Sequence, residues 1–191
     1  LARKTITFDH WRFECVKPGG AFISAQNGIN DDRIADIVGR KNEVPCIVTI
    51  GAGMYEPGHA MRTDNGSVGF KIGELDGKDT PRAQHLAKLL SAVAATKVTT
   101  NLFGERWSKL AVNCMANPIA GLSGLGSAEV RSEPIPSRIA IFVAAEAIRV
   151  GRAAGYEVEP IFRVAGHGYA ELAADMAASA KSFSGGRPSL F

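Results

Sequence analysis

The chain has 191 residues, of which 46% are hydrophobic and 21% charged, and its formal net charge is +3. This balance is typical of a folded globular protein and excludes an intrinsically disordered chain, while the length allows one large core or two smaller ones. The basic residues are scattered rather than clustered, so we expect neither a nucleic-acid partner nor an anionic membrane surface.

The cysteines and the apolar runs indicate a cytoplasmic protein. Cys15, Cys46 and Cys114 are odd in number, widely separated and without a CxxC motif, so we expect reduced thiols. No run approaches the roughly 18 consecutive apolar residues of a membrane-spanning helix, and the first residues lack the apolar core of a signal peptide. The four histidines share no ligand spacing with one another or with the cysteines, and no metal site is predicted.

The first predicted elements are a strand and a helix on either side of Asn27-Gly28. Residues 21–26, AFISAQ, form the short apolar run of a buried parallel strand. An Asn-Gly pair can make a hairpin turn, but here it is followed by Asp31, a suitable first residue of a helix, and later by Gly39, a suitable helix end. Apolar residues at helical spacing lie between them: Ile34, Ile37 and Val38. We therefore predict strand, turn and helix.

Further strands and a helix are predicted up to residue 100. Residues 46–52 should form a second buried strand, and 59–64 should pair with 68–75 in an antiparallel hairpin across Asn65-Gly66.

The next helix is predicted from Pro81 to Ala95, because proline is favoured in a first helical turn. Its inward side should carry Leu86, Leu89, Leu90 and Val93. Residues 97–100 suit a short strand. This alternation of strands and helices favours α/β packing.

Strand patterns stop near residue 101, and helices are predicted over 103–117, 136–154 and 160–180. In the second of these helices the inward residues should be Ile139, Phe142, Val143 and Val150, with Gly155 closing the helix. The fold class is therefore α/β followed by all-α, with one domain over residues 1–100 and another over 101–191. Ligands usually bind in the cleft that two such domains leave.

The segment RWSKLAVNCMANP, residues 106–118, carries polar residues at four-residue spacing in an otherwise apolar helix. Lys109, Asn113 and Asn117 would drift only about 40° per step and form one narrow line, which we call the polar stripe. A lysine in a cleft can act as a general acid when desolvation lowers its pKa, and asparagine can orient carbonyl and hydroxyl groups. The stripe therefore suits proton delivery to an oriented substrate.

Other interpretations of the stripe stay open. Polar helix residues often just face water, although the apolar flanks here favour a pocket or a partner. Asn117 precedes Pro118, which should end or kink the helix, and the asparagines could then satisfy backbone groups at the bend. Glu105 and Arg106, one turn earlier, could tune the pKa of Lys109, but they are interpreted first as surface ion-pair residues.

The segment ERWSKLAVNCMANPIAGLSG resembles the central signature of the ketopantoate reductases (2-dehydropantoate 2-reductases), roughly W-x-K-L-x-x-N-x-x-x-N. SAQNGIND resembles the strand end of that family, and the residues from Pro57-Gly58 to IGELDG resemble the strands that follow it. The resemblance covers roughly residues 17–191. It implies part of a Rossmann, NAD(P)-binding domain followed by a helical domain like the C-terminal domain of 6-phosphogluconate dehydrogenase.

The resemblance also implies roles for individual residues. Lys109 matches the lysine that protonates the ketone oxygen, and Asn113 and Asn117 match asparagines that bind the substrate. Asn27 matches an asparagine that contacts both the nicotinamide side of the cofactor and the substrate. Two weaker matches are Ser189, which would contact the substrate carboxylate, and Met54, whose backbone would contact the cofactor.

Some features of the family are not found in this sequence. GAGMYEP, residues 51–57, lacks the third glycine of a GxGxxG phosphate loop, and a glutamate that contacts the cofactor in relatives would fall beyond Phe191. We therefore expect these 191 residues to be a fragment of a reductase that by itself binds NADPH poorly, is inactive and tends to aggregate. The choice between NADPH and NADH is not determined by the residues present.

The function that the resemblance implies is NADPH-dependent reduction of 2-dehydropantoate to (R)-pantoate in pantothenate and coenzyme A biosynthesis. One alternative is a reductase of the same fold that acts on another 2-keto acid. A second is a non-catalytic helical dimerisation module in which the stripe is an interface. The alanine-rich helices are compatible with a homodimer.

Overall fold

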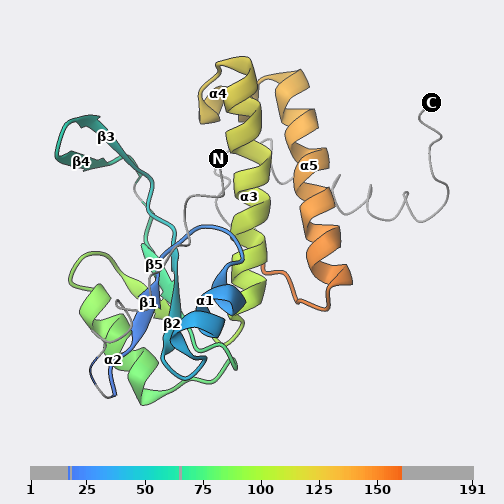
Figure 1. The fold of residues 1–191 in the computed structure, drawn as a ribbon. Helices are drawn as coiled ribbons and strands as arrows, with labels where there is room; N and C mark the ends of the chain where they lie inside the picture. Colours follow the sequence, from blue (N-terminus) through green and yellow to red (C-terminus); the bar gives the residue numbers. More distant parts are fainter. Residues whose placement is uncertain (1–16, 18, 65, 161–191) are drawn as a thin grey trace. The chain divides into compact units, whose positions relative to one another are not determined.

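The computed structural model describes residues 17, 19–64 and 66–160, and the chain divides into two compact units, Leu1–Leu102 and Phe103–Phe191. The first unit is an α/β structure and the second is helical across residues 103–160, which confirms the predicted fold class (Figure 1). The helix predicted over 160–180 lies outside the described residues. No described helix is both long and apolar enough to cross a membrane.

The first unit is built on a four-stranded sheet with the order β1-β2-β5-β6. Its strands are β1 (Phe22–Ser24), β2 (Glu43–Val48), β5 (Phe70–Ile72) and β6 (Thr96–Val98). The pairs β1–β2 and β5–β6 are parallel, whereas β2 and β5 are antiparallel. The carboxyl end of β5 therefore lies at the same sheet edge as the amino ends of β1 and β2.

The predicted sequence of strand, Asn-Gly turn and helix is confirmed. Helix α1 (Asp31–Val38) follows β1, and Gly39 ends it with φ 84°, a conformation that glycine adopts without steric cost. Asn30 is the N-cap residue. One detail differs, because Ile37 is exposed and Ala35 is buried in its place against the sheet.

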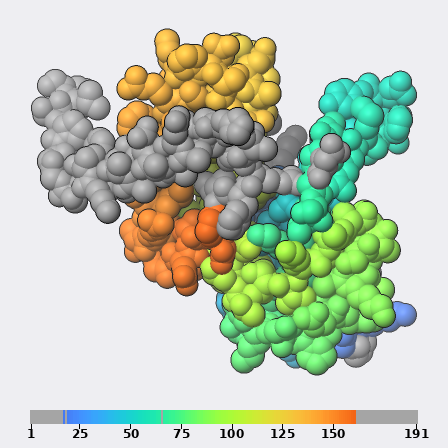
Figure 2. Space-filling model, turned by 180° about the vertical axis from the view of Figure 1, so that it is seen from behind, coloured from blue at the N-terminus to red at the C-terminus, as the bar shows by residue number. Residues whose placement is uncertain are grey.

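The hairpin predicted across Asn65-Gly66 is wrong. Strand β4 (His59–Arg62) instead pairs with β3 (Ala52–Glu56) across a turn at Gly58, which has φ 79°. Asp64 explains the difference, since its carboxylate accepts hydrogen bonds from the amides of Gly51 and Gly66 and closes the base of this hairpin. Figure 2 shows the hairpin, in teal, projecting from the rest of the first unit.

Helix α2 (Pro81–Leu90) packs on the sheet through Ala83 and Ala87. Thr80 caps its start by accepting a hydrogen bond from the Ala83 amide at 3.1 Å. The helix is shorter than predicted, and Leu89 and Val93 are exposed rather than inward. In Figure 1, α2 (green) and α1 (blue) lie on opposite sides of the sheet.

The second unit contains α3 (Leu102–Ser123), α4 (Ser127–Ser132) and α5 (Pro134–Ala153). Its core is formed where α3 packs against α4 and α5, and the buried members are Ala111, Met115, Ala116, Val130, Ala140 and Ala144. The short helix α4 was not predicted. It begins where Glu129 accepts a hydrogen bond from the Gly126 amide at 2.6 Å.

The predicted helix end at Asn117 is also wrong, because α3 continues through Pro118 to Ser123. Proline inside a helix costs about 3 kcal/mol through the lost hydrogen bond and the clash of its ring. The extra turn packs Ile119 and Ala120 against the core of the second unit, and this burial offsets the cost. Asn117 therefore lies within the helix and not at a bend that ends it.

The buried side of α5 differs from the prediction. Gly155 does follow the helix end, with φ 90°, but the residues that pack inward are Ala140, Ala144 and Gly151. The larger residues Ile139, Phe142 and Val150 are about half exposed. Small residues lie on the inner side because α3 approaches α5 too closely for larger ones.

Candidate functional site

The polar stripe lies on a single face of α3. Lys109, Asn113 and Asn117 are all inside one continuous helix, so the spacing of four residues places each about 6 Å further along the axis. They lie about 160–240° around the helix from Ala111, the fully buried residue of the core. Lys109 and Asn113 are partly buried and Asn117 is exposed. The core residues Ala116 and Ala120 lie about 140° and 180° around the helix from Ala111, so the stripe runs along the border of the core of the second unit.

Arg106 is a residue of this face that the sequence interpretation missed. It precedes Lys109 by three residues and Asn113 by seven, which places it about 220° around α3 from Ala111. Its exposed fraction is only 4%, so the interpretation of Arg106 as a surface ion-pair residue is wrong. The i, i+3, i+7 spacing from Arg106 was the sequence signal that could have found it.

The amino-terminal half of α3 is held in place by aromatic packing. The Trp107 ring lies against Gly151 of α5, where a Cβ atom would come within 2.8 Å of the indole. Tyr156 extends this contact, with its ring centroid 5.3 Å from Phe103 and 6.1 Å from Trp107. Two turns of α3 beside Lys109 are thereby fixed against the end of α5.

Asn27 lies on the other unit, beyond the carboxyl end of β1. It is exposed, and its carbonyl oxygen accepts a hydrogen bond from the Asn30 side-chain amide at 3.0 Å. Gly28 has φ 91°, which lets the chain turn sharply between β1 and α1. Nucleotide ligands bind outside the carboxyl ends of strands in open α/β sheets, and Asn27 lies at such an end.

The last two predicted site residues are Met54 and Ser189. Met54 lies in the projecting hairpin with 69% of its surface exposed. Ser189 lies outside the described residues. The residues 51–57 around Met54 form strand β3 rather than a loop between a strand and a helix, so they do not make a phosphate loop.

The first unit also has a hollow of about 690 Å³, lined by charged residues of the segments that follow α1 and β5. Its lining includes Arg40, Lys41, Glu74, Leu75, Asp76, Lys78, Thr80, Pro81 and Arg82. Because β5 is antiparallel to β2, this hollow lies at the sheet edge opposite to Asn27. It is therefore separate from the edge at which a nicotinamide cofactor would bind.

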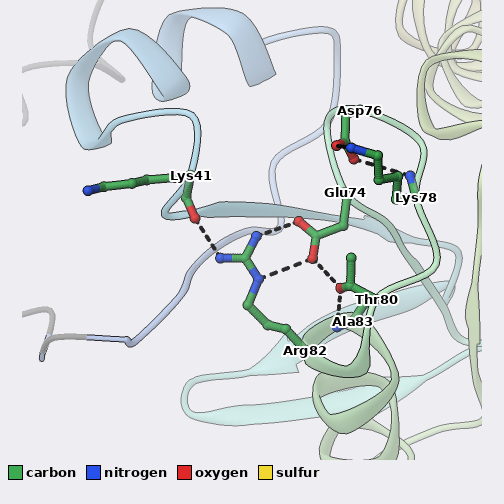
Figure 3. Close-up of polar contacts among 7 residues, drawn as sticks. All are labelled: Lys41, Glu74, Asp76, Lys78, Thr80, Arg82 and Ala83. Atoms are coloured by element: carbon green, nitrogen blue, oxygen red, sulfur yellow. Dashed lines mark hydrogen bonds and ion pairs between the residues drawn. The ribbon is translucent and has the colours of Figure 1, made fainter.

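Charged groups in this hollow form ion pairs and hydrogen bonds with one another (Figure 3). Glu74 forms a two-point ion pair with Arg82, accepts a hydrogen bond from Thr80 at 2.6 Å, and is almost fully buried. Arg82 also donates to the carbonyl of Lys41 at 2.5 Å. Burial alone would raise the Glu74 pKa, but the hydrogen bonds from Arg82 and Thr80 and the charge of Arg82 outweigh it, so the pKa lies below its usual value. This network fixes the start of α2.

We expect Glu74→Gln to lower the free energy of unfolding by about 1–2 kcal/mol at neutral pH, because Arg82 loses a buried counter-charge while keeping contact with solvent. The folded-state pKa is lowered, so the stabilisation is complete above the usual glutamate pKa and is lost as the pH falls through the lowered value. Urea unfolding of both proteins between neutral and acidic pH measures this. Asp76→Asn, at the fully exposed Asp76–Lys78 pair, is the control and should change little. If the difference in free energy of unfolding between Glu74→Gln and the wild type did not change with pH, the lowered pKa of Glu74 would be contradicted.

The polar stripe lies in a segment that is similar to a known protein family. Residues 101–187 match the family model described as the C-terminal domain of ketopantoate reductase PanE/ApbA. This range contains Lys109, Asn113 and Asn117. No curated protein matches the chain in sequence.

Solved structures share the fold at low sequence identity. A 2-dehydropantoate 2-reductase from Geobacter metallireducens GS-15 is 22% identical, with a TM-score of 0.65 over 88% of this chain and 54% of its own. D-mandelate dehydrogenase in complex with NADH is 19% identical, with a TM-score of 0.69 over 87% and 53%. A dimeric ketopantoate reductase from Staphylococcus aureus is 17% identical, with a TM-score of 0.59 over 83% and 48%. The chain thus spans about half the length of these structures.

Proposed function

We propose that this protein is a nicotinamide-dependent reductase that converts 2-dehydropantoate to (R)-pantoate, because residues 101–187 match the family model of the ketopantoate reductase C-terminal domain. The observation that carries the proposal is the polar stripe. A lysine and two asparagines share one narrow line along α3, and all three lie within one continuous helix. This line places the three polar groups at successive turns, where they could contact one bound substrate.

In the proposed reaction, Lys109 donates a proton to the ketone oxygen of the substrate. When bound, the reduced nicotinamide supplies the hydride that the carbonyl carbon accepts. The positive charge of Lys109 also stabilises the negative charge that develops on the oxygen, and a group fixed by the packing of Trp107 needs little reorganisation to do so.

The remaining residues of the stripe would bind and orient the substrate. Asn113 and Asn117 follow Lys109 at successive turns of the same line, so their amides are placed to bind different polar groups of one substrate. Asn27 would contact the nicotinamide side of the cofactor. The Met54 backbone and Ser189 stay proposed as cofactor and substrate contacts. A division of roles follows, with residues 1–100 contributing to the cofactor site and 101–191 to substrate binding and catalysis.

A second candidate function is reduction of another 2-keto acid by the same mechanism. It is kept because the chain shares its fold with D-mandelate dehydrogenase (TM-score 0.69) as it does with a 2-dehydropantoate 2-reductase (TM-score 0.65). The NADH in that structure also keeps NADH and NADPH both open as cofactors of this protein. Lys109 would keep its role, and the side chains around the substrate would set the selectivity.

The test is the oxidation of NADPH and of NADH by the complete protein, with 2-dehydropantoate compared against a panel of 2-keto acids that includes benzoylformate. We expect 2-dehydropantoate to have the highest kcat/KM, by about tenfold or more over each other acid, since a site that binds a substrate hydroxyl rejects analogues without it. A higher kcat/KM with another acid would mean that this acid is the substrate, and the proposed type of reaction, reduction of a 2-keto acid, would still hold. A folded protein that binds the cofactor but reduces none of the acids would contradict the proposal.

A further inference from the structure

The chain contains two Asn-Gly pairs, Asn27-Gly28 and Asn65-Gly66, whose glycine amides have different surroundings. An asparagine followed by glycine is prone to deamidation, because the glycine amide nitrogen can reach the carbonyl carbon of the asparagine side chain and no Cβ atom stands in its way. The glycine amide is the attacking group in this reaction. Its hydrogen bonds therefore decide how readily each pair reacts.

The Gly66 amide is held by a charged acceptor. It donates a hydrogen bond to Oδ1 of Asp64 at 2.7 Å, in the contact that closes the base of the β3–β4 hairpin. This bond must break before the Gly66 nitrogen can attack a side chain. Since a hydrogen bond to a carboxylate is stronger than one between neutral groups, the contact with Asp64 should slow the reaction of the second pair.

The Gly28 amide has no such contact. Across residues 17, 19–64 and 66–160 it donates no hydrogen bond, and Asn27 is exposed. Around Gly28 there is also space, because a Cβ atom built there would meet one atom within 4 Å, the side-chain nitrogen of Asn30 at 3.4 Å. The attacking nitrogen and the side chain that it attacks are therefore both accessible in the first pair.

Asn30 also favours the reaction at Asn27. Its side-chain amide donates a hydrogen bond to the Asn27 carbonyl oxygen at 3.0 Å. When the Gly28 nitrogen loses its proton, the negative charge is shared with that oxygen across the peptide bond. A donor already placed at this oxygen stabilises the charge as it develops. The turn between β1 and α1 thus combines an accessible nucleophile with a donor at the atom that takes up the charge.

We propose that Asn27 is a site of spontaneous deamidation in the folded protein, and that the contact with Asp64 protects Asn65. The deprotonated Gly28 nitrogen attacks the side-chain carbonyl carbon of Asn27, a C–N bond forms, and ammonia leaves to give a cyclic imide. Water then opens the imide at either carbonyl. The product is aspartate or isoaspartate, and nothing is oxidised or reduced.

The modification should lower the activity of the protein, and this consequence rests on the proposed function. Both products have a negative charge where Asn27 has an amide, and isoaspartate also lengthens the main chain of the turn. These changes alter the group that is proposed to contact the nicotinamide side of the cofactor. The loss of kcat/KM should therefore follow the fraction of Asn27 that is converted.

The test is peptide mapping by mass spectrometry of the complete protein during incubation at mildly alkaline pH, where the attacking nitrogen loses its proton more readily. We expect Asn27 to be converted about tenfold faster than Asn65, or more, which is the effect of one hydrogen bond to a carboxylate. In urea the two turns unfold, and the two pairs should then react at similar rates. Equal rates in the folded protein, or a faster reaction at Asn65, would overturn the proposal.

Asp64→Ala tests the cause of the difference. It removes the acceptor of the Gly66 amide, so it should raise the rate at Asn65 about tenfold and leave the rate at Asn27 unchanged. Asp79→Ala, at an exposed aspartate outside both turns, should change neither rate. If Asn65 stayed as slow in Asp64→Ala as in the wild type, the proposed protection by Asp64 would be wrong.

The freshly purified protein separates this inference from the proposed function. If the fresh protein reduces none of the 2-keto acids, the proposed function fails, and peptide mapping still decides whether Asn27 is deamidated. If the fresh protein is active and its kcat/KM stays constant while Asn27 is converted, the inferred loss of activity is overturned.

Discussion

Lys109→Ala is expected to lower kcat for the 2-keto acid substrate by roughly a thousandfold, the size of effect that loss of a positioned proton donor and its charge produces. Lys109 is not among the buried core residues, so the variant should fold normally. The cofactor dissociation constant, followed by the fluorescence of the reduced nicotinamide, should stay unchanged. Steady-state kinetics of the complete protein measures the loss of kcat.

Two further variants separate proton donation from simple binding. Asn113→Ala removes a neighbour on the same stripe and should act mainly by raising KM, since an orienting amide contacts the substrate before and during the reaction. Lys88→Ala, at an exposed lysine of α2, should leave kcat and KM unchanged. If Lys109→Ala kept wild-type turnover, the stripe would have no catalytic role, and the alternative of a non-catalytic module would be favoured.

The second large effect is expected at the contact between α3 and α5. Gly151→Ala should lower the free energy of unfolding by about 1–3 kcal/mol, because the new Cβ atom would meet the buried Trp107 ring at 2.8 Å and force it to move. In an open helix the same substitution is favourable, since alanine is about 1 kcal/mol better than glycine. Chemical denaturation of the complete protein gives the difference.

Gly121→Ala in α3 is the matched control. No atom lies within 4 Å of the position of its Cβ, so the change should raise the free energy of unfolding by about 0.5–1 kcal/mol. The two identical substitutions should therefore have opposite signs. Equal effects at both sites would mean that the indole does not restrict α5, and that the close approach of the two helices does not position the amino-terminal half of α3.

The elements that were predicted correctly are those whose local signals agree with their packing. The turn at Asn27-Gly28 is followed by Asp31 and a helical apolar pattern, and the structure has the predicted strand and helix there. The stripe of Lys109, Asn113 and Asn117 needs only the 3.6-residue period of a helix, so its shared face could be read from spacing alone. Whether the stripe performs the proposed chemistry stays a prediction.

The errors arose where long-range contacts decide between local alternatives. Asn65-Gly66 is a strong turn signal, but Asp64 uses its carboxylate to close a different hairpin, with its turn at Gly58. Pro118 is a strong signal for a helix end, but the burial of Ile119 and Ala120 favours continuing α3. A local pattern does not contain the free energy of contacts that form only after the chain folds.

The sequence by itself determined the change from α/β to all-α structure near residue 101 and the single face shared by the polar residues of α3, because both follow from the periodicity of side chains along the backbone. Only the tertiary structure decided which side of each helix faces the core. In α5 the larger residues were expected inside, yet the buried residues are Ala140, Ala144 and Gly151, and at Gly151 the Trp107 ring leaves no room even for a Cβ atom. It was likewise packing that buried Arg106 and left Phe142 about half exposed, because the distance between two helices is set by all the side chains between them.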